Sequence, residues 1–496
     1  MRRLLAALLG GATLLALAAL LAGAALVAVA APTQAQAHTV ARGLADAVTF
    51  DFTDWTDNEA HALHELAAKL NAKYVRFDVY WNQAEPEKGV FAENAEKTGY
   101  LDNVVKAVDA ADDEGLKVII VTYRVPKWAS NRAFWNDPNL FSRGKDSDGY
   151  CNYYAPSADG VAAFGEFGQH LSKLLTGKVA AYEPWNEPNL WVYLYPQTYG
   201  GDDAYAVHRY AAMLKAFHDG VAIGDPGALI VGGCTSPIGD PLGTDGRSRT
   251  SPQGFAQALV QTDVGGVKAT EFFDVYDHHP YTPGGSKDMR PEAAPSDPKT
   301  TVQLKNLSTL HSCFPGKPFY LTEYGYNTST SLVFGGARVS QVEQAAYLKR
   351  AYAYAARFDW VKLMCWYQLK DFSPTNKATD DRGIYMGLRT LSGSAKRAWY
   401  AFARGNHLTI KAPSGVRYGS TASLTGRLTC ATVGGIKGRP LVVQAYRPST
   451  GWRTLKTITT AKDGYYRTSV KPTSTTTYRL TWKGVVTSTT RKVLVL

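Results

Sequence analysis

The chain has 496 residues, of which 45% are hydrophobic and 20% are charged. These proportions exclude an intrinsically disordered chain and are typical of a folded protein with more than one domain. The net charge of +11 is unevenly placed, because residues 411–496 hold 15 Lys and Arg against one acid, Asp463, whereas residues 4–410 hold 37 basic and 42 acidic residues. A neutral-to-acidic body with a basic tail indicates two regions with different roles.

The N-terminus has the pattern of an export signal. Two arginines precede an apolar run over residues 4–31 and a small-x-small cleavage site, Ala35-Gln36-Ala37. The pattern predicts a signal peptide over residues 1–37, no transmembrane segment after its removal, and a secreted protein, with cell-wall association as a further expectation. Because the apolar run is longer than about 18 residues, an uncleaved membrane anchor is the alternative.

Cysteine usage predicts no metal site. The five cysteines have an odd count, so at least one thiol is free, and their spacing leaves the pairing open; they are Cys151, Cys234, Cys313, Cys365 and Cys430. The sequence has no Cys-x-x-Cys pair and no phosphate-binding loop. We therefore expect no metal and no cofactor.

A strand-then-helix alternation occurs eight times between about residue 46 and residue 405. The expected strands are Ala47–Phe52, Tyr74–Trp81, Lys117–Tyr123, Val179–Trp185, Ala228–Gly233, Phe273–His279, Pro318–Glu323 and Val361–Trp366. The expected helices are Asn58–Leu70, Tyr100–Glu114, Asp159–Leu175, Asp203–Asp219, Gln253–Gln261, Thr301–His311, Val339–Arg357 and Ser394–Arg404. This pattern predicts an α/β fold, a (β/α)8 TIM barrel over residues 38–408. A doubly wound sheet is the alternative, but no glycine-rich nucleotide loop follows any strand.

The composition changes after the barrel. Residues 409–496 are rich in Thr, Ser, Gly and Val and alternate polar with apolar residues, which predicts a small all-β sandwich of immunoglobulin-like type. Its positive charge favours an anionic cell-wall polymer as partner, whereas a solvated spacer is the alternative. We expect no nucleic-acid partner. Five aromatic residues include candidates for stacking on sugars: Tyr446, Trp452, Tyr465, Tyr466 and Trp482.

Two glutamates end predicted barrel strands. Glu187 follows the fourth strand, where Pro188 stops the extended run, and Glu323 ends the seventh. Period-two alternation puts Glu323 on one face with Phe319 and Leu321, and it puts Glu187 on one face with Glu183 and Trp185. The two glutamates are therefore expected to face each other across the barrel mouth. Hydrolysis of a glycosidic bond needs such a pair of carboxyl groups, whereas either glutamate alone is equally well explained as a structural cap.

The motifs around these glutamates resemble the clan A retaining glycoside hydrolases, with families 39 and 5 closest in pattern. The motifs that carry the resemblance are Trp185-Asn186-Glu187-Pro188-Asn189, Thr322-Glu323-Tyr324-Gly325, Arg76-Phe77-Asp78-Val79-Tyr80-Trp81 with Glu85-Pro86-Glu87-Lys88-Gly89, His279-Pro280-Tyr281, and Trp366 on the eighth strand. The resemblance covers about residues 46–404 and leaves the tail out. It implies an exported enzyme that cleaves β-glycosidic bonds of a polysaccharide, cellulase-like or β-xylosidase-like.

The resemblance also implies roles for individual residues. Glu323 is expected to be the nucleophile and Glu187 the proton donor and base. The expected substrate-binding residues are Asn186 at the sugar 2-hydroxyl, Arg76 and Tyr281 beside the nucleophile, His279, Trp366 as a stacking floor, and Trp81. Strict alternation would turn Asn186 away from the site, so its role requires the fourth strand to break its pattern there.

Three other interpretations stay open. His278 and His279 are adjacent, and parity with Tyr281 selects His279 as the one that faces the barrel axis. His61 and His64 have metal-like spacing, but a solvated helix face explains them better. A non-catalytic sugar-binding protein on a barrel scaffold is the alternative function.

Overall fold

The computed structural model describes residues 40–45, 57–68, 70, 72–96, 98–135, 145–239, 249–284, 286–329, 338–373, 375, 384–403, 406–430, 434–435, 437–448, 451–482 and 486–496. The expected signal peptide and the expected first strand, Ala47–Phe52, lie outside these residues. Among the helices of the described residues, none is both long enough and apolar enough to cross a membrane.

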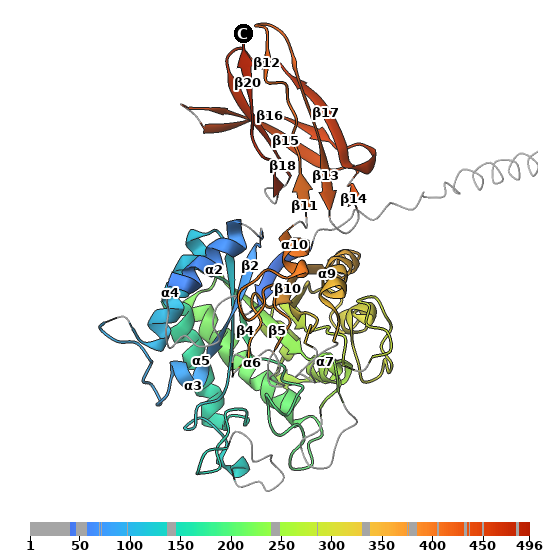
Figure 1. The fold of residues 1–496 in the computed structure, drawn as a ribbon. Helices are drawn as coiled ribbons and strands as arrows, with labels where there is room; N and C mark the ends of the chain where they lie inside the picture. The colour runs from blue at the N-terminus through green and yellow to red at the C-terminus, as the bar shows by residue number, and fades with distance from the viewer. Residues whose placement is uncertain are drawn as a thin grey trace, which may run out of the picture. The chain divides into compact units, whose positions relative to one another are not determined.

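Eight parallel strands close into a barrel, as the sequence predicts (Figure 1). In chain order they are β1 (Ala41–Ala45), β2 (Tyr74–Tyr80), β3 (Lys117–Tyr123), β4 (Val179–Pro184), β5 (Leu229–Thr235), β8 (Val275–His278), β9 (Phe319–Tyr324) and β10 (Val361–Tyr367). Strand β1 pairs with both β2 and β10 and so completes the ring. It lies before the apolar run that predicted a first strand. Gly43 of β1 is required there, because a side-chain carbon at this position would lie 2.5 Å from Cys365 Sγ.

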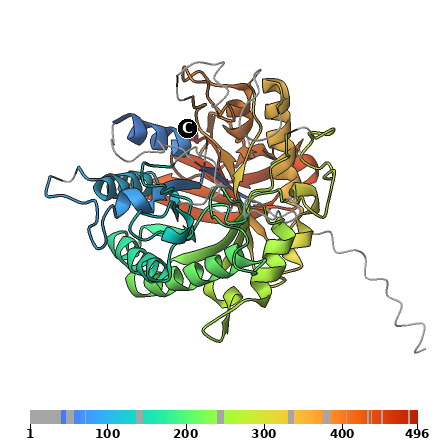
Figure 2. The same ribbon diagram turned by 90° about the horizontal axis from the view of Figure 1, so that it is seen from below.

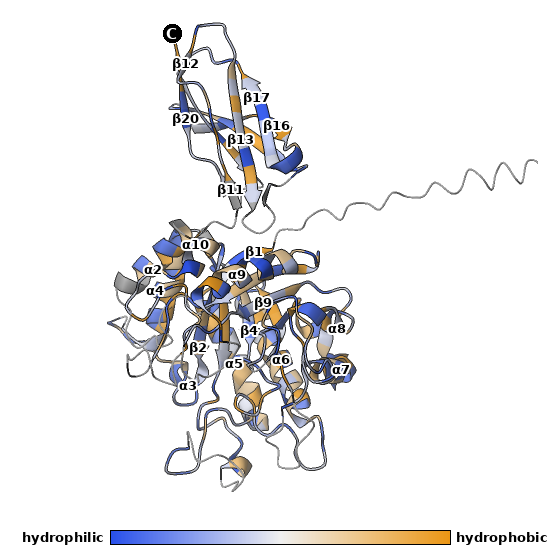
Figure 3. Cartoon of the chain, turned by 45° about the vertical axis from the view of Figure 1, so that its right-hand side comes forward, coloured by the Kyte–Doolittle hydropathy of each residue, from blue (hydrophilic) through white to orange (hydrophobic). Residues whose placement is uncertain are grey.

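Helices surround the barrel (Figure 2). They are α2 (Asp57–Ala68), α4 (Tyr100–Asp113), α5 (Ala158–Leu174), α6 (Tyr205–Gly224), α7 (Pro252–Gln261), α8 (Ser308–His311), α9 (Gln341–Ala355) and α10 (Arg397–Ala403). The helix expected over 301–311 is shorter and follows a 3-10 turn, η3 (Leu304–Asn306). A short helix α3 (Trp81–Ala84) and the hairpin of β6 (Asp263–Val264) and β7 (Val267–Lys268) are additions. The ring helices carry both hydrophilic and hydrophobic residues (Figure 3), as expected for helices with one buried side.

The barrel interior is apolar below its mouth. Its buried side chains are Ile119, Ala181, Val231, Val275, Tyr320, Leu363 and Cys365. On β9 the inward residue is Tyr320, whereas Phe319 and Leu321 belong to the layer between strands and helices. The predicted inward row of Phe319, Leu321 and Glu323 is therefore wrong. Sequence alternation fixes which residues share a face but not which face is inside, since both faces of a barrel strand are buried.

The described residues from 406 onward form two sheets, as expected for an all-β tail, and all strand pairs in them are antiparallel except β12 with β20, which is parallel. One contains β11 (Asn406–Leu408), β13 (Ala422–Cys430), β14 (Gly434–Gly435) and β17 (Tyr465–Val470). The six-stranded sheet contains β12 (Gly415–Val416), β15 (Pro440–Arg447), β16 (Gly451–Thr459), β18 (Thr476–Trp482), β19 (Val486–Thr487) and β20 (Arg491–Val495). Because β11 already pairs with β13, the all-β region begins at 406, three residues before the expected boundary.

Candidate active site

Arg76 on β2 lies at the centre of a polar network at the barrel mouth. Its side chain is fully buried. Nε donates to Glu183 Oε2 at 2.8 Å, one terminal nitrogen donates to Glu323 Oε1 at 2.8 Å, and the other donates to Asn186 Oδ1 at 2.9 Å. Contacts to Asp78 Oδ1 at 3.3 Å and to Cys234 Sγ at 3.7 Å complete the set. One planar cation therefore holds groups from the second, fourth and seventh strands of the barrel.

The fourth strand breaks its alternation where the role of Asn186 requires it. Strand β4 ends at Pro184, and both Trp185 (φ 83°) and Glu187 (φ 41°) adopt the left-handed region. Residues other than glycine rarely adopt this conformation, so the turn is strained. As a result Asn186 and Glu187 both reach the network, while Trp185 is buried against Phe164 of α5. The expected shared face of Glu183, Trp185 and Glu187 is therefore wrong.

The seventh strand has a comparable irregularity. The pairing of β9 with β10 shifts register between Met364–Leu321 and Trp366–Tyr324. Thr322 and Glu323, which are adjacent, consequently both face the network: the Thr322 hydroxyl donates to Asp277 at 2.7 Å, and Glu323 accepts from Arg76. A bulge of this kind redirects a side chain that regular alternation would turn away.

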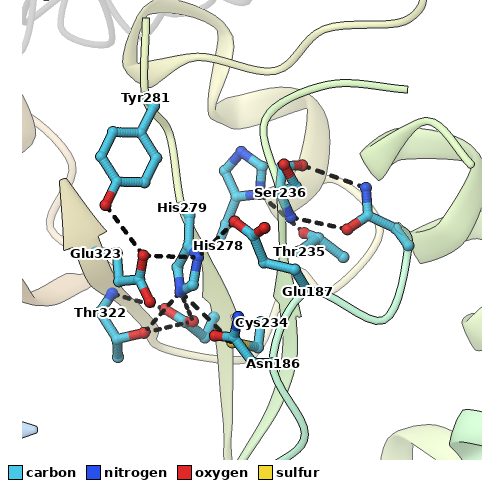
Figure 4. A network of polar contacts seen from close by, with 12 residues as sticks. Asn186, Glu187, Cys234, Thr235, Ser236, His278, His279, Tyr281, Thr322 and Glu323 are labelled. Carbon is cyan, nitrogen blue, oxygen red and sulfur yellow. Dashed lines mark hydrogen bonds and ion pairs between the residues drawn. The ribbon is translucent and has the colours of Figure 1, made fainter. Parts of the chain in front are cut away.

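His279 connects the two glutamates, as Figure 4 shows. Its Nδ1 lies 3.0 Å from Glu187 Oε1 and 3.6 Å from Glu323 Oε2. Its Nε2 lies 3.1 Å from Thr322 Oγ1 and 3.3 Å from Asp277 Oδ2. Parity therefore selected the correct histidine, because His278 is buried outside the network and bonds Thr235 Oγ1 at 2.8 Å.

Tyr281 completes the surroundings of Glu323. Its hydroxyl donates to Glu323 Oε2 at 3.0 Å, while Arg76 holds Oε1 (Figure 4). Both residues that the sequence offered as partners of this carboxylate thus bind it, one on each oxygen. The side chains of Glu187 and Glu323 are 12% and 13% exposed, which leaves each carboxyl group reachable from the mouth.

Burial and neighbouring charges shift the pKa values of Glu187 and His279. Burial raises the pKa of Glu187; the hydrogen bond and charge of His279 oppose this, and the negative charge of Glu323 adds to it. Burial lowers the pKa of His279, but the charge of Glu323 and the contacts with Cys234 and Asp277 outweigh it, and the pKa rises well above its ordinary value. A protonated His279 donates from both ring nitrogens, which fits its position between carboxylates.

A second pair of carboxyl groups, those of Glu183 and Asp277, is buried more deeply than Glu187 and Glu323. Glu183 is fully buried, and burial raises its pKa to about 8 although Arg76 opposes this; the charge of Asp277 raises it further. Burial also raises the pKa of Asp277, but hydrogen bonds and the charge of His279 outweigh this and lower it below the ordinary range. The two carboxyl groups also bond each other. The two pKa shifts therefore have opposite directions, so that the protonated form is favoured at Glu183 and the ionised form at Asp277.

Two expected substrate residues are not available to a substrate. Trp366 is 0% exposed, belongs to the layer outside the barrel, and donates from Nε1 to Met386 O at 3.0 Å. Trp81 is 0% exposed and packs on Phe164 of α5 with ring centroids 4.9 Å apart. The aromatic residue of β10 that faces the barrel interior is its neighbour Tyr367, which is partly exposed. The motif match selected Trp366, whereas strand parity places Tyr367 at the mouth.

Sequence reasoning missed several members of the site. Glu183, Asp277 and Thr322 are polar residues inside apolar strands, and this is a signal that could have identified them. Tyr193 lies in the segment after β4. Its pKa is raised mainly by burial, and the negative charges of Glu187 and Glu323 raise it further. It therefore lies close to both glutamates, and nothing in its local sequence marks it.

The network also contains two groups of possible metal ligands. In each group the ligand atoms lie within 4.8 Å of one another; the groups are Glu183, Cys234, Asp277, His279, and Glu187, His279, Glu323. The guanidinium of Arg76 contacts both groups, and the raised pKa of His279 favours its cationic form. These two positive charges disfavour a metal ion at either place.

Elsewhere, His64 bonds Glu114 on the exposed side of α2, as expected for a solvated helix face. Within the described ranges, Cys151, Cys234, Cys313 and Cys365 are not joined in disulfide bonds.

A closed parallel barrel whose fourth and seventh strands each bring a glutamate to one buried network defines the fold and site of a glycoside hydrolase. The chain belongs to the Cellulase family, glycosyl hydrolase family 5, whose model matches residues 34–363. The protein is therefore a glycoside hydrolase with a carbohydrate substrate. The clan A resemblance is confirmed, with family 5 as the family of this chain.

Solved structures with the same fold include a GH5_18 protein from Streptomyces cattleya in complex with GlcNAc, with 16% identity and a TM-score of 0.51 over 74% of this chain and 80% of that chain. A family 39 glycoside hydrolase from Bacteroides cellulosilyticus WH2 has 19% identity and a TM-score of 0.48 over 90% and 81%. A monomeric beta-xylosidase from Caulobacter crescentus CB15 has 15% identity and a TM-score of 0.48 over 88% and 94%. Of these three structures the GH5_18 protein has the TM-score above 0.5, and at 16% identity its similarity concerns the fold alone. No curated protein matches the sequence.

Glu183 provides a test of the buried proton. In Glu183→Gln a neutral amide can still accept from Arg76 and donate to Asp277, so we expect kcat/KM within about 5-fold of the native value. In Glu183→Leu the guanidinium loses a buried acceptor, which costs about 1–3 kcal/mol, and displaced catalytic groups should lower kcat/KM by about 100-fold. Steady-state kinetics and thermal unfolding measure both effects. Equal damage in the two variants would mean that Glu183 acts as an anion.

Tyr367 provides a test of the stacking floor. Loss of its ring in Tyr367→Ala should lower kcat/KM by about 10-fold, which corresponds to about 1.4 kcal/mol of lost sugar contact. The matched control is Trp366→Phe, which should lower the unfolding temperature and leave kcat/KM of the folded enzyme unchanged. The opposite pattern would restore Trp366 as the sugar-contacting residue.

Proposed function

We propose that this protein is an exported retaining glycoside hydrolase that cleaves β-glycosidic bonds of a polysaccharide by double displacement. The observation that carries the proposal is the spacing of the two glutamates. One carboxyl oxygen of Glu187, one carboxyl oxygen of Glu323 and a ring nitrogen of His279 all lie within 4.8 Å of one another. Carboxyl groups about 5–5.5 Å apart favour retention, whereas inversion needs about 6.5–9.5 Å to admit a water molecule.

In the first step Glu323 is the nucleophile. Arg76 and Tyr281 each bind one of its oxygens and fix the carboxylate toward the mouth. A carboxylate oxygen bonds to the anomeric carbon while the bond to the leaving oxygen breaks, and Glu187 gives its proton to that oxygen. The raised pKa of Glu187 favours its protonated form, which is the form that can give this proton.

In the second step Glu187 is the base. Once Glu323 is esterified its negative charge is gone, so the pKa of Glu187 falls and its carboxylate accepts a proton from water. The hydroxide oxygen bonds to the anomeric carbon, the ester bond to Glu323 breaks, and the sugar leaves with net retention.

Asn186 is suited to the sugar 2-hydroxyl. Arg76 holds its Oδ1 at 2.9 Å, which leaves the Nδ2 amide group as the donor toward the mouth. Hydrogen bonds to the 2-hydroxyl strengthen in the transition state of such enzymes. The strained turn at Trp185 and Glu187 supports this role, because it aims Asn186 and the proton donor at one substrate.

Removal of either glutamate tests the chemistry. Glu323→Ala should lower kcat by about 10⁴-fold or more on all substrates, and added azide should restore turnover by replacing the nucleophile. Glu187→Ala should retain rapid formation of the glycosyl-enzyme for aryl glycosides with good leaving groups and lose turnover of poor ones. Proton NMR of the first-formed anomer should show retention. Inversion, or full activity of Glu187→Ala on a poor leaving group, would contradict the assignment.

The pH dependence tests the coupling between the two groups. Burial raises the pKa of Glu187, and the Glu323 charge adds to this, so kcat/KM should fall as pH rises through that raised pKa. In Glu323→Gln the charge is absent, and the pKa of Glu187 should be lower than in the native protein. NMR titration with ¹³C-labelled glutamate, assigned with Glu187→Gln, measures the difference. An unchanged pKa would remove the charge-coupling step.

Export is supported by the N-terminal pattern. A polysaccharide substrate is supported by the basic tail, which would hold the enzyme near an anionic cell-wall polymer. If the signal is cleaved as proposed, the exported chain begins at His38, which N-terminal sequencing of the secreted protein would detect. A chain that keeps residues 1–37 in the membrane fraction would instead support an anchor.

A further inference from the structure

An aromatic and cationic cluster lies on the six-stranded sheet of the all-β region. Tyr446 on β15 is directly opposite Trp452 on β16, with ring centroids 5.3 Å apart. The guanidinium carbon of Arg479, on β18, lies 4.0 Å from the centre of the Trp452 ring. Arg479 Nε donates to Gln444 Oε1 at 2.9 Å. We call these four residues the Trp452 cluster.

The Trp452 cluster faces away from the sandwich core. The core side chains of these strands are Leu441, Val443, Ala445, Tyr478, Leu480 and Trp482, all buried. They alternate with Gln444, Tyr446 and Arg479, which therefore lie on the opposite face. Tyr446 is 40% exposed. Tyr466 and Trp482 belong to the core, so three of the five aromatic candidates from the sequence remain for binding: Tyr446, Trp452 and Tyr465.

The cluster is fixed before any ligand binds. Arg479 is held by the ring of Trp452 on one side and by Gln444 through Nε. Its two terminal nitrogens bond to no residue in the described part of the chain. A guanidinium oriented in this way loses little conformational freedom when it binds a carboxylate.

Charge on this face is of one sign. The strands of the six-stranded sheet contain no Asp or Glu, and the single acid of residues 411–496, Asp463, lies on η4 (Lys462–Gly464) next to the other sheet. Lys492 on β20 pairs with Thr477, which pairs with Tyr446, so it shares the face of the cluster. Arg479 and Lys492, which share this face with the rings of Tyr446 and Trp452, thus lack an acidic partner on their own sheet.

We infer that the Trp452 cluster is a binding site for a carboxylated polysaccharide, such as a uronic-acid polymer. Aromatic rings bind the apolar face of a pyranose ring, and the guanidinium fork binds carboxylate in two hydrogen bonds. A polyol phosphate would satisfy the charge but has no pyranose ring for Tyr446 and Trp452. The inference extends the proposed role of the basic tail and does not depend on which bond the barrel cleaves.

Binding to polygalacturonate tests the inference. The full chain carrying Glu323→Gln, which should not cleave the polymer, is the reference, and Trp452→Ala and Arg479→Gln are introduced into it. Each should weaken binding by about 10-fold in isothermal titration. The matched control is Tyr465→Ala, because Tyr465 on β17 is 57% exposed and also lies under a guanidinium, that of Arg427 at 4.9 Å, but on the other sheet. It should bind as the reference does.

Two further polymers separate charge from sugar. Methyl-esterified polygalacturonate keeps the rings and loses the charge, and polyglutamate keeps the charge and loses the rings; both should bind at least about 10-fold more weakly than polygalacturonate. Equal binding of either polymer, equal loss in Tyr465→Ala, or no binding of polygalacturonate would overturn the inference. Arg479→Gln leaves both rings in place and covers the case in which Trp452→Ala unfolds. Hydrolysis of a soluble aryl glycoside by Trp452→Ala in the native background should be unchanged, which keeps this result separate from the proposed function.

Discussion

The burial of one cation, Arg76, is the constraint on which the barrel mouth depends. Removing a guanidinium from water costs several kcal/mol unless charged and polar acceptors surround it. Here Glu183, Asn186 and Glu323 accept from it at 2.8–2.9 Å, and they come from β4, the turn after it, and β9, which is three positions away from β4 in the ring. The same contacts that offset this cost also fix the nucleophile and the amide beside it. Stability and catalytic geometry therefore rest on the same hydrogen bonds.

Two local irregularities bring the reacting groups to this cation. The fourth strand ends in a strained turn at Trp185 and Glu187, and the seventh strand shifts its register before Glu323. In a regular barrel both glutamates would point elsewhere, because side chains alternate along a strand. Strain of this kind persists only where surrounding contacts impose it. The contacts of His279 and Arg76 supply that constraint.

The protons of the site are distributed by environment. Glu183 and Glu187 are both buried acids with raised pKa values, and each is paired with a carboxylate, Asp277 and Glu323 respectively. His279 contacts the carboxylate of each pair, and its raised pKa favours the cationic form. The pair of Glu187 and Glu323 faces the mouth and is proposed to exchange its proton, whereas Glu183 and Asp277 have no exposure. Two similar pairs thus have different roles because one is reachable by substrate.

The sequence by itself determined the barrel, the all-β tail and the residues Glu187, Glu323, Arg76, His279 and Tyr281. It did so because eight repeated units and short motifs at strand ends are local signals. The tertiary structure decided which side chains of each strand face the barrel interior and which pack against the surrounding helices. Alternation cannot tell the inside of a barrel strand from its outside when both are buried, so the row of Phe319 and Leu321 was placed inside although it packs outside. The family resemblance placed Trp81 and Trp366 at the site, but both are fully buried in the layer outside the barrel. Glu183 and Asp277 join the site through contacts with Arg76 and Thr322, which are more than 40 residues away, so their local pattern marks them as buried polar residues but does not name their partners.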